Sequence, residues 1–288
     1  VLRLVGPYFS PNQTAFYLER SLFLGLGLAY ALSRYRHFVV AGLALILAAL
    51  LLTASCGALL LGLPVGLLIW GAGLLGGKRA SLAPSLRSPS VRLGSGWEHL
   101  RHRRRWVILG GSALCIVAIA ALWLLLGDRL TNSATLDHRL IIWRTSWALW
   151  RDYFWFGVGP NGFFWRYPAY LPLGALDEPN LLHPHNLWLE FATGWGMAGL
   201  LWLALLLRYL LRYAKQLLRN SYTATDQANR WLALALLAAL AAGLAHAQVD
   251  AFFVLPDLAL WNWMVLALLG VMGQRIQQDE IHYAADAT

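Results

Sequence analysis

The chain has 288 residues, of which 59% are hydrophobic and only 13% are charged. Soluble domains contain roughly 25% charged residues, so this composition excludes an ordinary soluble protein. A formal net charge of +9 would also suit a nucleic-acid-binding protein, but most basic residues lie in short segments between apolar runs. That distribution is typical of a protein oriented in a membrane. We therefore predict an all-α polytopic membrane protein without a nucleic-acid partner.

Seven apolar runs are long enough to cross the ~30 Å hydrocarbon core as helices. They cover residues 15–32, 37–55, 57–76, 106–126, 187–207, 231–249 and 258–273. The first run is the weakest because it contains Glu19 and Arg20, and an unpaired charge at mid-membrane costs at least ~2.5 kcal/mol. We expect these two side chains to lie near the interface or to pair with one another. Residues 1–288 should form a single membrane domain, and a start at Val1 suggests the C-terminal part of a longer protein.

Charge orients the predicted helices. Residues 77–105 carry eight Lys and Arg residues against the single acid Glu98, so the positive-inside rule makes this segment a cytoplasmic loop. Counting outward places the basic segment 208–230 on the same side and the long loop 127–186 on the opposite, non-cytoplasmic side of the membrane. This long loop is the only stretch large enough to house chemistry outside the bilayer.

Residues 137–156 of the long loop are predicted to form a helix that does not span the membrane. Tryptophans recur in it at three- and four-residue spacing, and arginines interrupt them (Trp143, Trp147, Trp150; Arg139, Arg144, Arg151). Such a helix would contact membrane lipids at the headgroup level and end at Gly157. Gly157, Gly159 and Gly162 formally match a dinucleotide-binding pattern, but they follow a helix instead of a strand, so we interpret them as a turn.

His185 directly precedes the apolar run 187–207 and is the best candidate for a base, because histidine can accept a proton at neutral pH. The alternative is purely structural: Asn186 caps the helix and Glu190 complements its positive end. A metal site at His183 and His185 is disfavoured because one tripeptide supplies too few ligands. The sequence therefore predicts no metal and no cofactor.

Two further sets of polar residues have open interpretations. Arg139 and Arg144 would face the same aqueous side as His185, where they either bind a diphosphate-carrying lipid substrate or anchor lipid headgroups. His246 and Asp250 lie four residues apart, which predicts one helix face. They line a proton relay or transport path, or they are simple interface residues.

Several motifs resemble those of the O-antigen ligase and polymerase superfamily of bacterial envelope glycosyltransferases. The signature is His185-Asn186, then nine residues, Gly196, two residues and Gly199. Segments resembling the same family occur around it in the same order, at residues 137–143, 156–163 and 182–190, and residues 6–12 resemble its outer turn.

The resemblance implies a GT-C-like membrane fold, several further N-terminal helices, and an active site at the periplasmic loop. It implies metal-independent, inverting transfer of a glycan from an undecaprenyl-diphosphate donor to a lipid or glycan acceptor. His185 would deprotonate the acceptor and Arg139 would hold the donor diphosphate. One departure is Cys56, where the family often has an arginine; Arg144 or Arg20 would replace it, or activity is altered or lost. The rival function is a transporter of a small anion such as bicarbonate, with a non-catalytic remnant as a third reading.

Overall fold

The computed structural model describes residues 3–8, 10–76, 133–172, 174, 181–219, 227–250 and 258–272. The chain divides into two units, Val1–Lys78 with Leu136–Thr288, and Arg79–Thr135. Apart from residues 133–135, everything described belongs to the first unit.

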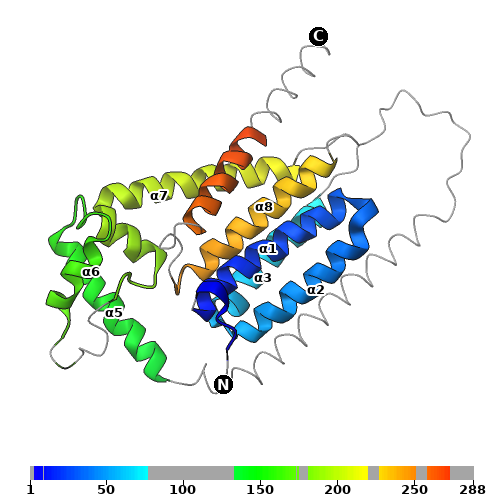
Figure 1. Cartoon of the computed structure of the whole chain (residues 1–288). Coiled ribbons are helices and arrows are strands. Elements are labelled where there is room, and N and C mark those ends of the chain that lie inside the picture. The colour runs from blue at the N-terminus through cyan, green and yellow to red at the C-terminus, as the bar shows by residue number, and fades with distance from the viewer. Residues whose placement is uncertain are drawn as a thin grey trace, which may run out of the picture. The chain divides into compact units, whose positions relative to one another are not determined.

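All regular elements in these ranges are helices (Figure 1), as predicted. The longer ones are α1 (Pro11–Ala31), α2 (Arg36–Thr53), α3 (Leu63–Gly76), α5 (Ser133–Asp152), α7 (Leu187–Arg219), α8 (Gln227–His246) and the helix Leu258–Met272. The shorter ones are α6 (Gly162–Arg166), the π-helical η3 (Gly57–Gly62) and the 3-10 turns Gly6–Tyr8, Ser33–Tyr35 and Tyr167–Tyr170.

Four helical stretches are long and apolar enough to cross a membrane: Arg36–Thr53, Gly57–Leu74, Leu187–Gln216 and Asn229–His246. The prediction of an all-α membrane protein is confirmed. Two of the other predicted spans correspond to α1, which is a helix of 21 residues, and to the shorter apolar helix Leu258–Met272. The predicted span 106–126 lies outside the described residues.

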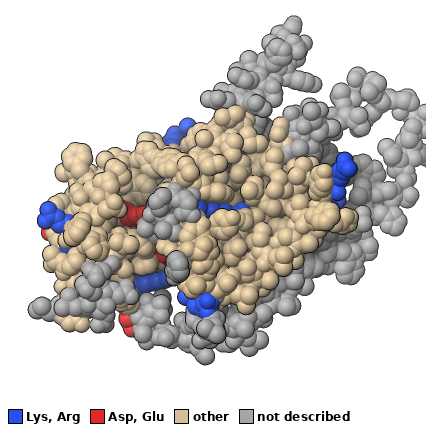
Figure 2. All heavy atoms as spheres, viewed as in Figure 1, with Lys and Arg blue, Asp and Glu red and all other residues tan. Residues whose placement is uncertain are grey.

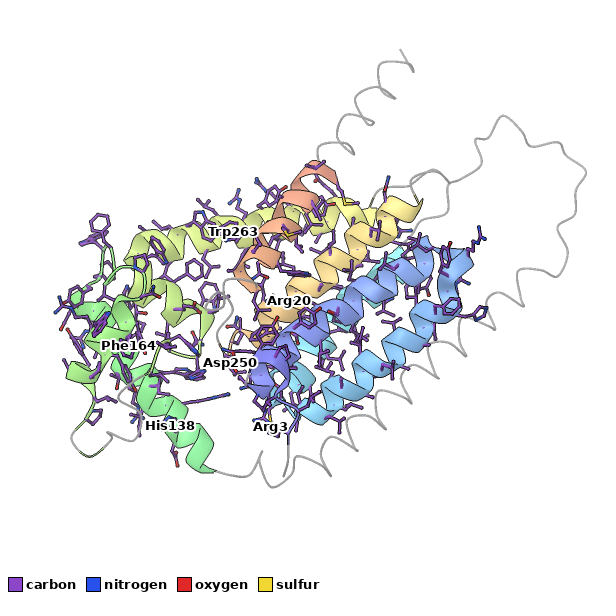
Figure 3. The ribbon with its side chains drawn as sticks, in the orientation of Figure 1. Arg3, Arg20, His138, Phe164, Asp250 and Trp263 are labelled. Atoms are coloured by element: carbon purple, nitrogen blue, oxygen red, sulfur yellow. The ribbon has the colours of Figure 1, made fainter. Side chains whose placement is uncertain are left out.

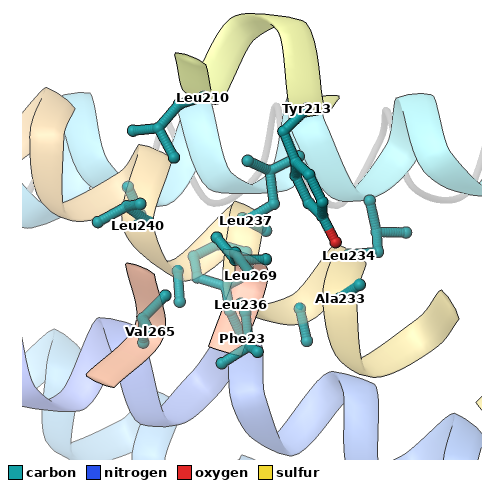
Figure 4. Close-up of a cluster of buried hydrophobic side chains, with 14 of the residues drawn as sticks. Phe23, Leu210, Tyr213, Ala233, Leu234, Leu236, Leu237, Leu240, Val265 and Leu269 are labelled. Carbon is teal, nitrogen blue, oxygen red and sulfur yellow. The ribbon is translucent and has the colours of Figure 1, made fainter. Parts of the chain in front are cut away.

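Helix α8 forms the centre of the packed helices and lies against α1 and α3. Of its 18-residue apolar stretch 67% is buried, against 11% of α2. Alanines along α8 are buried. Small side chains let helices pack closely, which matters in a membrane because no hydrophobic effect drives helices together there. Leu234 and Leu237 pack with Phe23 of α1, Tyr213 of α7 and neighbouring side chains in one apolar cluster (Figure 4).

Helix α2 presents apolar side chains outward, including Phe38 (80% exposed) and Leu45 (74% exposed). Most of the surface in Figure 2 is neither acidic nor basic, and Lys and Arg form separate spots on it. An apolar surface of this extent is unfavourable in water. The helices that carry it are long and apolar enough to lie in a membrane. Lipid is the expected solvent for this surface.

The predicted helix 137–156 is present but its bounds differ. Helix α5 ends at Asp152, and turns occupy the residues from there to Gly157. It packs through Ile142 and Leu149 against Phe163 of α6, so its apolar face is covered by protein. Of its tryptophans, Trp150 is buried and Trp147 is half exposed, with 52% of its surface accessible. The sequence pattern alone had suggested a lone helix lying on lipid.

Candidate functional site

The segment before α7 is fastened to the residues that follow α8. The Leu187 N–H donates to the Ala247 carbonyl (2.8 Å), and the Asn186 side-chain amide donates to the Gln248 carbonyl (2.9 Å). The Trp188 indole N–H donates to the Gln248 side-chain oxygen (2.9 Å). The Asn186 side-chain oxygen accepts the backbone N–H of Leu189 (3.1 Å), which confirms the predicted N-cap. These bonds fix the entry of α7 against the end of α8.

His185 adopts a backbone conformation that is uncommon for a residue with a Cβ, with φ at 49°. Its ring Nδ1 lies 3.1 Å from the Asp250 Oδ1. The Asp250 side chain is 5% exposed and that of His185 is 27% exposed. The buried carboxylate assigns the ring proton to Nδ1 and leaves the lone pair on Nε2, the arrangement of a histidine that acts as a base.

His183 is the second histidine at this site and has a different character. Its ring meets that of His185 edge to face, with centroids 4.2 Å apart. Burial, and then the proximity of His185, lower the pKa of His183 to about 4, while Asp250 raises it slightly. His183 is therefore a neutral imidazole near pH 7 and a poor proton acceptor, so His185 is the better candidate for the base.

Asp250 is the residue of this site that sequence reasoning misplaced. Helix α8 ends at His246, and Asp250 lies four residues further along in a turn. The expectation that both share one helix face is wrong, because the chain leaves helical geometry between them. Asp250 instead reaches across 65 positions in sequence to His185, and no local pattern signals such a pair.

His246 belongs to a separate buried cluster. Its Nδ1 lies 3.3 Å from Glu19 Oε1 of α1, and its Nε2 lies 3.4 Å from the Ser55 hydroxyl. The Phe16 ring stacks on it with a centroid distance of 3.7 Å. Gly57 lies directly against the His246 ring, where any Cβ would collide with it. Glu19 of α1 is thus paired with His246 at the end of α8.

Glu19 and Arg20 are both buried among the helices, at 0% and 2% exposure. Arg20 donates from Nη1 to the Leu258 carbonyl (3.2 Å) and lies over the Trp261 ring at 4.8 Å from its centroid. The attraction between a cation and an indole face partly offsets the free energy that the cation loses when it leaves water. Figure 3 shows Arg20 directed inward from α1 among the helices. Residues of other helices therefore contact both charged side chains.

Glu19→Gln should lower stability moderately. The amide keeps the shape of the side chain, but it replaces a charge-assisted contact to His246 with a neutral one, a loss of about 1–2 kcal/mol. The temperature at which half the detergent-solubilised protein stays monodisperse measures the effect. Ser21→Ala, two residues further along α1 at an exposed hydroxyl, is the control and should change little. Equal stability of Glu19→Gln and wild type would contradict a structural role for the pair.

The predicted turn at Gly157 is joined to a break in α7. The backbone N–H groups of Val158 and Gly159 donate to the Thr193 and Gly194 carbonyls, at 2.7 and 3.0 Å. In return, the Met197 N–H donates to the Phe154 carbonyl at 2.8 Å. The six residues from Phe154 to Gly159 thus take over hydrogen bonds that α7 loses at its break.

Gly196 causes that break, with φ 65° and ψ −152° inside α7. Its missing side chain also makes room, since a Cβ there would lie 2.4 Å from the Trp155 backbone. Gly157 is matched to it: φ is 68°, and a Cβ would lie 2.4 Å from the Thr193 carbonyl. Gly199 packs under Trp195, where a Cβ would meet the Trp195 Cβ at 2.4 Å. Gly157 and Gly196 therefore let the loop turn approach α7 closely, whereas Gly199 makes room within α7 itself.

The remaining predicted residues are placed as follows. Gly159 has a positive φ of 84° with open space around it, and Glu190 lies in the first turn of α7, as expected. Arg139 is half-buried and Arg144 is exposed on α5. No hydrogen bond of either arginine to His185 occurs among the described residues. Figure 3 labels their neighbour His138 on α5, and Asp250 beyond the end of α8.

Cys56, where the resemblance led us to expect an arginine, is half-buried between α2 and η3. Arg3 occupies part of this region from the N-terminal segment. Its guanidinium donates to the Thr53 carbonyl (2.7 Å) and to the Asn12 side chain (3.0 Å). The outer turn thus has a cation beside it that the sequence motifs did not indicate.

The fold and this site together define a multi-pass helical membrane protein with a histidine–carboxylate pair at the mouth of a broken helix. The chain matches the family model described as O-antigen ligase over residues 41–204, more than half of its length. The protein therefore belongs to the O-antigen ligase family. No curated protein and no solved structure matches the chain.

Proposed function

We propose that the protein transfers a glycan from an undecaprenyl-diphosphate donor to a hydroxyl of a lipid or glycan acceptor at the outer face of the plasma membrane. Membership of the O-antigen ligase family supports glycosyl transfer by a membrane enzyme. The observation that carries the proposal to a mechanism is the His185–Asp250 contact of 3.1 Å, in which a buried acid orients a partly exposed imidazole.

In this mechanism His185 Nε2 accepts the proton of the acceptor hydroxyl. The hydroxyl oxygen attacks the anomeric carbon from the face opposite the diphosphate, and the bond to the diphosphate oxygen breaks with its electron pair. The product has inverted configuration, and undecaprenyl diphosphate leaves. Asp250 holds the ring proton at Nδ1 and stabilises the imidazolium that forms, the role that a buried carboxylate plays beside a catalytic histidine.

Fixed cations would stabilise the negative charge of the leaving diphosphate. Arginine forks bind phosphate oxygens in pairs and keep their charge at any pH, so they stabilise a departing diphosphate without a metal ion. Arg139 and Arg144 of α5 are the residues that we propose for this role. Arg3, beside the outer turn that carries Cys56, is placed to serve in addition.

The assignment of Arg139 is tested in proteoliposomes supplied with a lipid-diphosphate-linked glycan and an acceptor. Arg139→Ala should lower the transfer rate about 10²-fold, the size typical of removing one donor to a developing anion. Arg139→Lys should recover part of it, because the charge returns without the fork. Arg151→Ala, at the exposed end of the same helix, is the control and should transfer normally. An unimpaired Arg139→Ala would remove this arginine from the mechanism.

The rival function, transport of a small anion such as bicarbonate, depends on His246. This histidine is 0% exposed and is held between Glu19, Ser55 and Phe16. Ionisable residues buried in spans are the usual sign of a transport path. Anion flux into the same proteoliposomes, abolished by His246→Ala but unaffected by His185→Ala, would favour the transporter. We favour the enzyme because the His185–Asp250 pair lies at a helix mouth, whereas transport sites lie near the bilayer midplane.

A further inference from the structure

Three side chains with metal-binding atoms meet at the start of α7. The ligand atoms of His183, His185 and Asp250 all lie within 4.8 Å of one another. The His185 Nδ1 and Asp250 Oδ1 are already 3.1 Å apart. A tetrahedral Zn²⁺ with bonds of about 2.0–2.1 Å separates its ligand atoms by about 3.4 Å. The ligand atom of His183 lies within 4.8 Å of both, so the set is close to the spacing of a coordinated ion.

The sequence argued against a metal because His183 and His185 alone are too few ligands. Asp250 supplies the missing one from a segment far away in the chain. Two imidazoles and one carboxylate match the donor set of three-ligand zinc sites, which keep water in the fourth position. Magnesium and calcium prefer sets made entirely of oxygen. The chemistry of the cluster therefore favours zinc.

Burial supports the same conclusion. The Asp250 side chain is 5% exposed, whereas that of His185 is 27% exposed and opens the cluster to an ion from outside. The His183 Nδ1 is buried and has no hydrogen-bond partner within the described ranges of the chain. Buried polar atoms in proteins are nearly always satisfied. A bound ion would give the buried His183 imidazole the partner that it lacks among the described residues.

We propose that His183, His185 and Asp250 form a Zn²⁺ site that switches the transferase off. The binding part of this inference stands alone, and the inhibition rests on the proposed function. A metal on His185 Nδ1 takes the place of the ring proton, so the neutral imidazole carries its remaining proton on Nε2. Nε2 then has no lone pair for the acceptor hydroxyl. The ion is thus an inhibitor that competes with the Nδ1 proton, and the reaction itself does not use it.

Binding is tested on the purified protein in detergent, without a polyhistidine tag, by titrating Zn²⁺ against a chromophoric chelator. We expect saturable zinc binding that Mg²⁺ at about 1 mM does not prevent. His183→Phe keeps the edge-to-face ring contact but has no ligand atom, and it should weaken binding about tenfold or more. His37→Phe, at the start of α2, is the control and should bind normally. Equal zinc affinity in His183→Phe and wild type, with both proteins folded by gel filtration, would overturn the site.

Inhibition is tested in the transfer assay with added Zn²⁺ and with a chelator. Zinc should stop transfer in wild type and in His37→Phe, the chelator should restore it, and His183→Phe should resist about tenfold more zinc. Transfer that zinc inhibits equally in His183→Phe would overturn the switch. If zinc binds as expected but no variant transfers glycan, the metal site stands and the proposed function fails. If transfer occurs and zinc neither binds nor inhibits, the function stands and the zinc site fails.

Discussion

Replacing His185 with alanine should abolish glycan transfer, with a fall of at least about 10³-fold in rate. The variant loses both the proton acceptor and the partner of the buried Asp250 carboxylate, which lies 3.1 Å from the ring. Transfer is measured in proteoliposomes as glycan appearing on the acceptor. His183→Phe, which keeps the neighbouring ring but removes its nitrogen atoms, provides the matched control, because we do not assign His183 to catalysis. It should retain transfer when zinc is chelated.

Asp250→Asn refines the same prediction. The amide is nearly the same size, but it can present an N–H to Nδ1 and so move the ring proton to Nε2, the wrong tautomer for a base. We expect a loss approaching that of His185→Ala, and the double variant should be little worse than either single one, because the two residues act as a unit. Losses that multiply in the double variant would show that Asp250 acts apart from His185. Full transfer in His185→Ala would remove the base from the mechanism.

Local chemistry made part of this site readable from sequence. Asn186 could be identified as an N-cap because a cap needs only a short polar side chain next to the first turn, and the structure confirms it. Apolar runs likewise predicted the helices, since a run of sufficient length has few alternatives in a membrane. The bounds of α5 were less accurate because its final turn depends on where the chain attaches to α7.

The partners of the buried charged groups could not be read in the same way. Asp250 lies four residues from His246, and helical spacing paired them, but the helix ends between them and each finds a partner elsewhere. Glu19 likewise pairs with a residue more than 200 positions away. Nothing in a single sequence records which helices pack together, so such pairs emerge only from the fold.

The glycines of the signature also could not be explained from the sequence alone. Their spacing was sufficient to suggest the family, yet it gave no reason for glycine at these positions. The structure gives the reason: Gly196 adopts a φ of 65°, and the Phe154–Gly159 stretch of chain fills the resulting break in α7. The loop helix α5 leads directly into this stretch. Gly196 therefore couples the loop to the helix that begins beside His185.

Gly196→Ala should be the most damaging change to the fold among single methyl additions. A residue with a Cβ in this backbone region carries a strain of about 1–3 kcal/mol, and the added carbon would lie 2.4 Å from the Trp155 backbone, which cannot move aside as a side chain can. Together these effects are expected to cost more than about 4 kcal/mol, a range reached only by a few mechanisms. Folded protein should be nearly absent from detergent extracts.

The matched control lies two residues away in the same helix. A Cβ on Gly194 meets nothing within 4 Å, so Gly194→Ala adds the same methyl group without a collision. It should keep or slightly raise stability, by up to about 1 kcal/mol, because alanine favours the helix over glycine. Fluorescence-detected gel filtration after a temperature series measures both variants. Since the two substitutions differ only in backbone conformation and available space, equal stability would show that α7 does not need its break, and that the loop turn is not held there.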